Sequence, residues 1–299
     1  MAAGEACDFK LPTNPRNLCA TRHTTGRVTT AGTLPAVTKT RLDSLLVERG
    51  LFDNRSRAAA AVLAGAVRLG ADGRAAQKPG QMVRGDVELA VDQPPPFVSR
   101  GGTKLANALD RLGVDPSGRR CLDVGASTGG FTDCLLKRGA AHVVALDVAY
   151  GELDWGLRND PRVTVIERAN ARAIEPKILP YQPEMVVVDV SFISLRKVLP
   201  AVLEAAAPSF DCLALVKPQF ELGRGRVGKG GVVRSADARR EALVTVAEEL
   251  AGGGWSVLGF ASSELPGPAG NRESFLWLAE PGRGGARTDV AAAAREVEP

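Results

Sequence analysis

The sequence has no apolar run long enough to form a membrane-spanning helix. Its longest nearly unbroken apolar stretch, Ala58–Val67, is far shorter than the roughly 18 residues that a bilayer span needs. Residues 1–38 contain only two acidic residues but also lack the apolar core of a secretory signal. We therefore predict a disordered or leader extension over residues 1–38, and a soluble, cytoplasmic protein with no membrane partner.

Cysteine is also scarce. The five cysteines form no C-x-x-C pair, and their odd number suits neither a disulfide framework nor a zinc site. A reducing compartment and the absence of a bound metal are the expectations. The net charge of +4 is mildly basic, which permits an anionic partner without demonstrating one.

Regular patterns begin near Lys39 and first describe a small domain. Leucines at helical spacing and an alanine-rich stretch predict two short helices, and short strands follow with turns at Asp72-Gly73 and Pro79-Gly80. The segment DQPPPF that comes next breaks both helix and strand, because each proline fixes φ and removes a donor. We predict an α+β domain over residues 39–92 and a linker over residues 93–99.

Seven apolar segments alternate with helical stretches over residues 100–280. The interior segments are continuous Val/Leu runs, as expected when helices cover both faces of a parallel sheet. This pattern predicts a doubly wound α/β domain, followed by a flexible tail over residues 281–299. The expected strands are Cys121–Val124, His142–Val148, Val163–Glu167, Met185–Val190, Cys212–Val216, Ser256–Ala261 and Phe275–Ala279.

The segment LDVGASTGGFTDCLL, residues 122–136, predicts a strand that leads through a glycine turn into a helix. Its G-x-S-x-G pattern fits a hydrolase nucleophile, but such a site needs a later histidine. His23 lies in the extension, and His142 begins the next strand. Triphosphate and dinucleotide sites would need G-x-x-x-x-G-K-[ST] or G-x-G-x-x-G here. The literal G-x-G-x-x-G, Gly223–Gly228, is followed by Lys-Gly-Gly and not by a helix.

The strand, glycine turn and helix still fit a binding site for a smaller ligand. Asp123 and Asp147 end consecutive strands, at the sheet edge where parallel sheets bind ligands. Carboxylates there accept hydrogen bonds from ribose hydroxyls or an α-amino group, so an adenosyl amino acid suits the pair. A tight turn with a capping aspartate and no ligand is the alternative. The predicted cofactor-binding residues are Asp123, Gly125, Ser127, Thr128, Gly129, Gly130, Phe131 and Asp147.

Four further charged residues lie where elements begin or end. Lys104 follows a Gly-Gly pair, Asp189 and Lys217 end apolar strands, and Glu273 lies between a Pro/Gly loop and the last strand. Each alone fits an ordinary solvated charge. Four of them at ligand-facing edges indicate a functional site.

Taken in order, these motifs resemble the TlyA family, the hemolysin-A-type ribosomal RNA 2′-O-methyltransferases with an FtsJ-like catalytic domain. The resemblance covers nearly everything from about Lys39 to Glu280, with minor departures at Phe97 and Ser274. It implies an S4 RNA-binding domain followed by a Rossmann-like S-adenosylmethionine-dependent methyltransferase domain. Ribosomal RNA is the implied partner and a cytidine ribose the implied target; we also expect a monomer. The motifs are VSRGG-x-KL, GASTGGFTD, DVSFIS, VKPQFE and GPxGNxE.

The family's Lys-Asp-Lys-Glu tetrad falls on Lys104, Asp189, Lys217 and Glu273. A 2′-hydroxyl is a poor nucleophile until a base takes its proton, and a lysine can do so only in its neutral form. Desolvation and a neighbouring positive charge favour that form. We predict that Lys217 is the base, that Lys104 holds the ribose, and that the two acids orient them. The sequence leaves open which lysine is neutral.

RNA contacts are expected from two segments. Residues 39–92 hold nine Lys/Arg against seven Asp/Glu, so the arrangement of the cations matters more than their number. The glycine-rich segment 223–234 is basic and contains no acid, as a phosphate clamp would be. Ordinary solvated surface is the alternative for both. The predicted RNA-binding residues are Arg41, Arg55, Arg57, Lys78, Arg224, Arg226 and Lys229.

Other functions fit part of this evidence. The chain could be a non-catalytic S4-type ribosome-binding protein, although a complete tetrad argues against this. A pseudouridine synthase with an S4 module would not bind S-adenosylmethionine. Pore formation finds no support in a chain without long apolar or amphipathic stretches.

Overall fold

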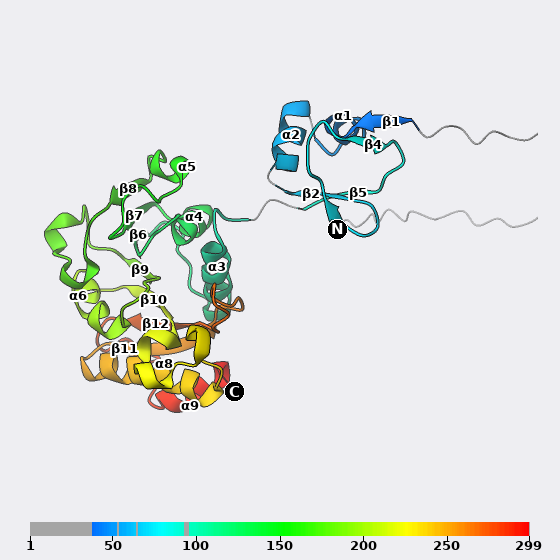
Figure 1. Cartoon of the computed structure of the whole chain (residues 1–299). Coiled ribbons are helices and arrows are strands. Elements are labelled where there is room, and N and C mark those ends of the chain that lie inside the picture. The colour runs from blue at the N-terminus through cyan, green and yellow to red at the C-terminus, as the bar shows by residue number, and fades with distance from the viewer. Residues whose placement is uncertain (1–37, 53, 64, 93–95, 299) are drawn as a thin grey trace, which may run out of the picture. The chain divides into compact units, whose positions relative to one another are not determined.

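The computed structural model describes residues 38–52, 54–63, 65–92 and 96–298. The chain separates into two compact units, Met1–Asp92 and Gln93–Pro299 (Figure 1). The predicted extension over residues 1–38 falls almost wholly outside the described residues, as do residues 93–95 of the predicted linker.

The first unit contains the two predicted helices, packed on short strands. Asn54 begins the second helix, because its Oδ1 accepts a hydrogen bond from the backbone N–H of Arg57 at 2.9 Å. Leu42, Leu46 and Val62 are buried in its core. The strand Lys39–Arg41, before the first helix, was not predicted. A segment of three residues forms a strand only by pairing with a distant one, here Met82–Arg84. The elements are β1 (Lys39–Arg41), α1 (Leu42–Glu48), α2 (Arg55–Leu63), β2 (Val67–Leu69), β3 (Arg74–Ala75), β4 (Met82–Arg84) and β5 (Leu89–Val91), with β1 paired to β4 and a second sheet of order β3-β2-β5.

The second unit is built on a seven-stranded sheet of order β11-β12-β10-β9-β6-β7-β8. All seven predicted strands are present. The predicted doubly wound α/β fold is confirmed, and within its sheet β12 runs antiparallel to both of its neighbours. Only residues 263–273 join β11 to β12, and so short a connection without a crossover helix favours an antiparallel pair. The strands are β6 (Arg120–Val124), β7 (His142–Leu146), β8 (Val163–Ile166), β9 (Met185–Val188), β10 (Asp211–Val216), β11 (Ser256–Ser262) and β12 (Ser274–Ala279).

Helices cover both faces of this sheet (Figure 1). Successive residues of a strand point to opposite faces, so Leu122 and Val186 pack on one side and Cys121 and Val187 on the other. One face is covered by α3 (Arg100–Leu112), α4 (Gly130–Lys137) and α5 (Trp155–Arg158), and the other by α6 (Leu199–Glu204), α8 (Ala236–Gly252) and α9 (Val290–Val297). The short helices are α7 (Pro218–Glu221), η1 (Ala171–Ala173), η2 (Pro176–Ile178), η3 (Leu195–Lys197), η4 (Arg224–Arg226) and η5 (Lys229–Gly231).

The prediction of a flexible tail over residues 281–299 is wrong. Asp289 caps helix α9 by accepting a hydrogen bond from the N–H of Ala292 at 2.7 Å. Ala293 and Ala294 are buried in the core beside α8 and β11, and Glu298 accepts a hydrogen bond from Arg239 at 2.8 Å. The sequence shows an alanine-rich end to the chain, but not the neighbouring elements α8 and β11 against which this helix packs.

The predicted linker over residues 93–99 is too long. Phe97 packs against the core beneath α3, and the hydroxyl of Ser99 caps α3 by accepting from the N–H of Gly101. A Cβ at Gly102 would lie 2.4 Å from the Phe97 side chain, so the glycine permits this contact. The packed part of the second unit therefore begins at about Phe97.

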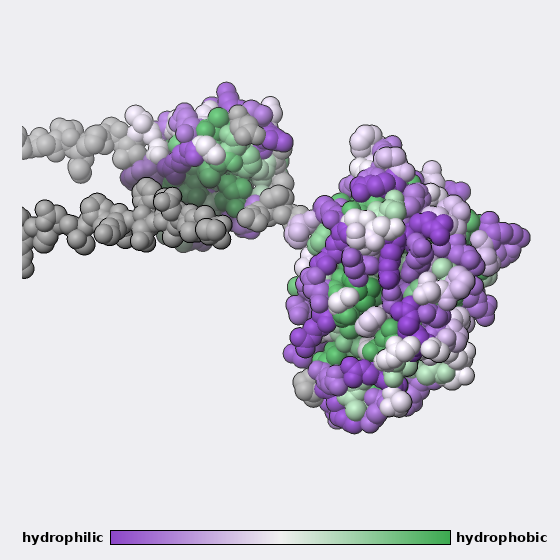
Figure 2. Space-filling view, turned by 180° about the vertical axis from the view of Figure 1, so that it is seen from behind, coloured by the Kyte–Doolittle hydropathy of each residue, from purple (hydrophilic) through white to green (hydrophobic). Residues whose placement is uncertain are grey.

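Hydrophilic side chains cover most of the face of the second unit that Figure 2 shows. Among the described residues, no helix is both long and apolar enough to cross a bilayer.

Candidate active site

A cleft of about 780 Å³ opens where β6, β9 and β10 end. This volume lies within the roughly 300–1,000 Å³ that is typical of small-molecule sites. The first turn of α3 and the loop 263–273 complete its walls. Because β12 runs antiparallel, its first residues lie at the same sheet edge as the last residues of the parallel strands.

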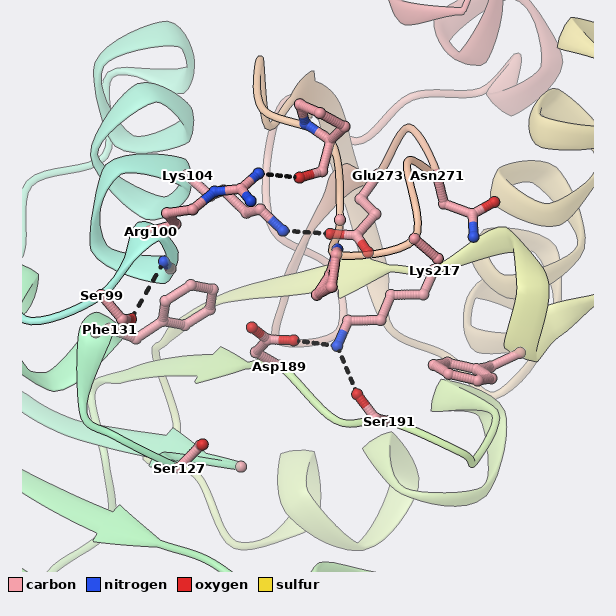
Figure 3. A pocket seen from close by; sticks show the side chains of 18 of the residues that line it. Ser99, Arg100, Lys104, Ser127, Phe131, Asp189, Ser191, Lys217, Asn271 and Glu273 are labelled. Atoms are coloured by element: carbon pink, nitrogen blue, oxygen red, sulfur yellow. Dashed lines mark hydrogen bonds and ion pairs between the residues drawn. The ribbon is translucent and has the colours of Figure 1, made fainter. Parts of the chain in front are cut away.

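The four predicted tetrad residues all line this cleft, as two ion pairs (Figure 3). Lys104 Nζ of α3 lies 2.5 Å from Glu273 Oε2, and Lys217 Nζ at the end of β10 lies 2.5 Å from Asp189 Oδ1 at the end of β9. The side chains of Lys104 and Glu273 are 8% and 1% exposed. The structure therefore brings together side chains that are up to 169 residues apart in the sequence.

The two lysines differ in their surroundings. Lys104 faces a buried carboxylate, and removal of either partner would leave an uncompensated charge away from water. Lys217 also donates a hydrogen bond to the hydroxyl of Ser191 at 2.8 Å. Sequence reasoning missed Ser191, although it lies two residues after Asp189 in the motif DVSFIS. Ser191 and Asp189 together orient the amine of Lys217.

The glycine turn approaches the tetrad closely. Gly125 has φ +83°, and a Cβ at this position would lie 2.4 Å from the carbonyl oxygen of Asp189. Ser127, with φ 46°, adopts a left-handed conformation that is costly for a residue other than glycine. Its N–H donates to Asp147 Oδ2 at 2.8 Å, which holds the turn in place. The turn is thus fixed between the ends of β7 and β9.

The predicted cofactor-binding residues divide into two groups. Asp123, Gly129 and Asp147 do not line the cleft. The carboxylate of Asp147 accepts hydrogen bonds from the N–H groups of Ser127 and Ala149, both at 2.8 Å. Asp147 lines a small hollow next to the cleft, and Ser127 lines both the hollow and the cleft. The residues that do line the cleft are Gly125, Ser127, Thr128, Gly130 and Phe131.

Asp123 is fully buried, contrary to the prediction that it contacts a ligand. Its Oδ2 accepts hydrogen bonds from the N–H of Thr132 at 2.9 Å and from the hydroxyl of Thr132 at 2.7 Å. Asp123 therefore joins β6 to α4. This is the arrangement that the sequence offered as the alternative: a tight turn with a capping aspartate and no ligand. The sequence places an acid at the strand end but does not show that α4 supplies its hydrogen-bond donors.

Asp123 should make stability depend on pH. Burial raises the pKa of its carboxyl to about 7. The hydrogen bond from Thr132 lowers this pKa in part, and the negative charge of Asp189 raises it further. An unfolded aspartate has a pKa near 4, so between about pH 4 and pH 7 the folded state binds more protons, and its stability falls as the pH rises. The variant Asp123→Asn should lack this decline. Urea unfolding at several pH values measures it, and equal slopes for both proteins would contradict the assignment.

Asn271 is a site residue that sequence reasoning missed. It is 1% exposed and lines the cleft. Its Nδ2 donates to the carbonyl of Gly231 at 2.8 Å, and its Oδ1 accepts from the N–H of Val233 at 2.8 Å. Asn271 therefore attaches the glycine-rich segment 223–234 to the loop that carries Glu273. Its position in the motif GPxGNxE was the available signal.

The rim of the cleft carries an exposed aromatic pair. Phe192 is 92% exposed and has φ 65°, and its ring lies 5.2 Å from that of Phe220 between centroids. Both side chains line the cleft. A left-handed phenylalanine open to solvent is costly, so this geometry points to a binding role for the rim.

The predicted RNA-binding residues have different surroundings. Arg41 and Arg55 both pair with buried Asp43, at 2.7 and 3.1 Å. The hydrogen bond from Arg41, helped by Arg55, holds the pKa of the Asp43 carboxyl well below its usual range. The two guanidinium groups thus converge on one face of the first unit. Arg57 on α2 and Lys78 are exposed.

One cation of the predicted phosphate clamp, the segment 223–234, binds another part of the protein. Arg226 forms an ion pair with Glu241 of α8. The side chains of Arg224 and Lys229 lie outside the described residues.

This fold and this site are those of the Rossmann-like methyltransferase class of enzymes. The FtsJ-like methyltransferase family matches residues 97–280. The chain belongs to this family.

The relatives extend the similarity to both units. The chain is 48% identical over 262 residues to the 16S/23S rRNA (cytidine-2′-O)-methyltransferase TlyA of Mycobacterium tuberculosis, with 87% of this chain and 95% of the relative covered. It is 38% identical over 234 residues to hemolysin A of Brachyspira hyodysenteriae, with 78% and 97% covered. A hemolysin-like protein of known structure from Streptococcus thermophilus is 36% identical, with a TM-score of 0.65 over 87% of this chain and 96% of that chain. The predicted resemblance to the TlyA family is confirmed.

Proposed function

We propose that this enzyme transfers a methyl group from S-adenosylmethionine to the 2′-hydroxyl of a cytidine in ribosomal RNA, acting in the cytoplasm. The observation that carries the proposal is the meeting of Lys104, Asp189, Lys217 and Glu273 in one cleft beside the glycine turn. The relative from Mycobacterium tuberculosis is described as an enzyme with this activity on 16S and 23S rRNA.

The cleft fits S-adenosylmethionine, which supplies a methyl group on a positively charged sulfur. The small residues of the turn Gly125–Gly130 bring the backbone to the wall of the cleft, and no Cβ can be added at Gly125 without a collision. Ser127, Thr128 and Phe131 would form the remaining wall of the binding site. Asp147, in the hollow next to Ser127, would accept hydrogen bonds from ribose hydroxyls.

Lys217 is the base in this proposal. Its amine, oriented by Asp189 and Ser191, would accept the proton of the 2′-hydroxyl as that oxygen attacks. Lys104, held by Glu273, would donate a hydrogen bond to the ribose and fix its position. Holding the two reacting groups in line supplies much of the acceleration.

The first unit would bind RNA through Arg41, Arg55, Arg57 and Lys78. We expect the double variant Arg55→Ala/Lys78→Ala to bind ribosomal subunits more weakly, since Arg41 remains to pair with Asp43 and the fold is retained. The slope of log affinity against log salt should become less steep by roughly 1.4–1.8, the value for two lost phosphate contacts. Filter binding at several salt concentrations measures this slope, and an unchanged slope would exclude these side chains as phosphate contacts.

The direct test of the function is a methyl-transfer assay. The full chain is incubated with tritium-labelled S-adenosylmethionine and separated small and large ribosomal subunits, and mass spectrometry then locates the methylated nucleotide. Label on a cytidine ribose is the expected result. Binding to subunits without transfer of label would favour the alternative of a non-catalytic S4-type ribosome-binding protein.

A further inference from the structure

A second hollow of about 550 Å³ adjoins the active-site cleft. Phe192, Gln219 and Phe220 line both cavities, so the two are continuous at the aromatic rim. The remaining wall comes from η1, from the segment 193–197, and from the end of α7 up to Gly223. We call this hollow the lateral groove.

Basic side chains determine the charge of the lateral groove. Arg172 and Lys197 are exposed, and neither forms an ion pair with any residue that the structure describes. Arg196 also lines the groove, with its Nη1 at 2.9 Å from Glu249 Oε2. Two cations are therefore free to bind an anion, and a third is partly compensated.

The acidic side chain in the groove wall, Glu221, lies 3.7 Å from Arg196 Nε, so it compensates Arg196 and leaves the charges of Arg172 and Lys197 uncancelled. Glu221 is buried, and its oxygens accept hydrogen bonds from the hydroxyl of Ser194 at 2.5 Å and from the N–H of Leu195 at 2.8 Å. Its carboxylate is thereby directed toward the backbone of the 191–196 segment. The groove as a whole is a positively charged channel that leads away from the tetrad.

We propose that the lateral groove binds the sugar-phosphate backbone of the RNA strand next to the methylated nucleotide. This inference rests on the proposed function, because a ribose that reaches Lys217 is attached to flanking phosphates that must leave the cleft. Arg172 provides a planar fork for a phosphate and Lys197 a point charge, which are the side chains that commonly contact nucleic-acid backbones. Continuity with the cleft favours an RNA strand over an acidic protein as the occupant.

The test compares two double variants of equal charge. Arg172→Ala/Lys197→Ala removes the free cations of the groove. Arg111→Ala/Arg295→Ala removes two exposed arginines on α3 and α9 that also lack ion pairs with described residues. Methyl transfer to ribosomal subunits is measured at several salt concentrations, and S-adenosylmethionine binding by calorimetry.

We expect the groove variant to raise KM for subunits about tenfold or more and to reduce the steepness of the salt dependence of kcat/KM by roughly 1.4–1.8. Its affinity for S-adenosylmethionine should stay within about twofold of the original. The control variant should show only the small effect of distant, screened charges. Equal behaviour of the two variants, or a matching loss of S-adenosylmethionine binding in the groove variant, would overturn the proposal.

A crosslinking experiment identifies the occupant directly. A photoreactive benzoylphenylalanine in place of Lys197 is activated in the complex with subunits, and the crosslinked positions are mapped. Crosslinks within a few nucleotides of the methylated position support the proposal, whereas crosslinks only to distant RNA or to a ribosomal protein refute it. If the unmodified enzyme transfers no label to either subunit, the proposed function itself has failed, which the groove variant alone would not cause.

Discussion

Replacing Lys217 with arginine is expected to lower kcat/KM for methyl transfer by about 100- to 10,000-fold, the range that general-base catalysis contributes. Arginine preserves the positive charge and can keep the ion pair with Asp189, so the fold should be retained. It does not release its proton at working pH and so cannot act as a base. Binding of S-adenosylmethionine, measured by calorimetry, should stay within about threefold.

Lys177→Arg is the matched control for this variant. Its side chain is 78% exposed and pairs with Glu175 outside the cleft, so the substitution should leave activity unchanged. Lys104→Arg answers the question that the sequence leaves open. If Lys217→Arg is fully active while Lys104→Arg is inactive, the role of base passes to Lys104.

Gly125→Ala should remove both cofactor binding and activity. The left-handed φ of +83° costs an alanine about 1–2 kcal/mol, and the new Cβ would meet the Asp189 carbonyl at 2.4 Å. Either the turn or the end of β9 must then move, and the tetrad residue Asp189 moves with it. We expect at least about a 30-fold loss of S-adenosylmethionine affinity and a larger loss of methyl transfer, with a lower melting temperature.

Gly151→Ala separates backbone strain from collision. Gly151 has φ +80°, and a Cβ there would meet no atom within 4 Å. The two variants therefore share the conformational cost, and only Gly125→Ala adds the contact with Asp189. Similar S-adenosylmethionine affinities in both would show that the close approach of the turn to β9 does not matter for binding.

The sheet and the tetrad could be predicted from the sequence because their signals are local. A strand buried on both faces is a continuous apolar run, and β9 and β10 are fully buried along their length. Asp189 directly follows β9, and Lys217 directly follows β10. Parallel strands bring these ends to one edge, so two of the four tetrad positions followed from topology.

The partners of charged side chains could not be predicted in this way. Arg55 reaches Asp43 across 12 positions, and Arg226 reaches Glu241 across 15. Asp123 and Asp147 are acids at strand ends, as predicted, but Oδ2 of Asp123 accepts hydrogen bonds from Thr132, and both oxygens of Asp147 accept hydrogen bonds from backbone N–H groups. Whether a charge faces a ligand or another part of the chain depends on tertiary contacts that no local pattern contains.

The pair formed by Lys104 and Glu273 joins the first helix of the catalytic unit to its last hairpin. A chain folded only as far as β10 would possess three members of the tetrad and would leave the Lys104 ammonium without its carboxylate. A complete tetrad therefore requires the β11-β12 hairpin to be in place. Opening of the β11-β12 hairpin would inactivate the enzyme while most of its sheet remained intact.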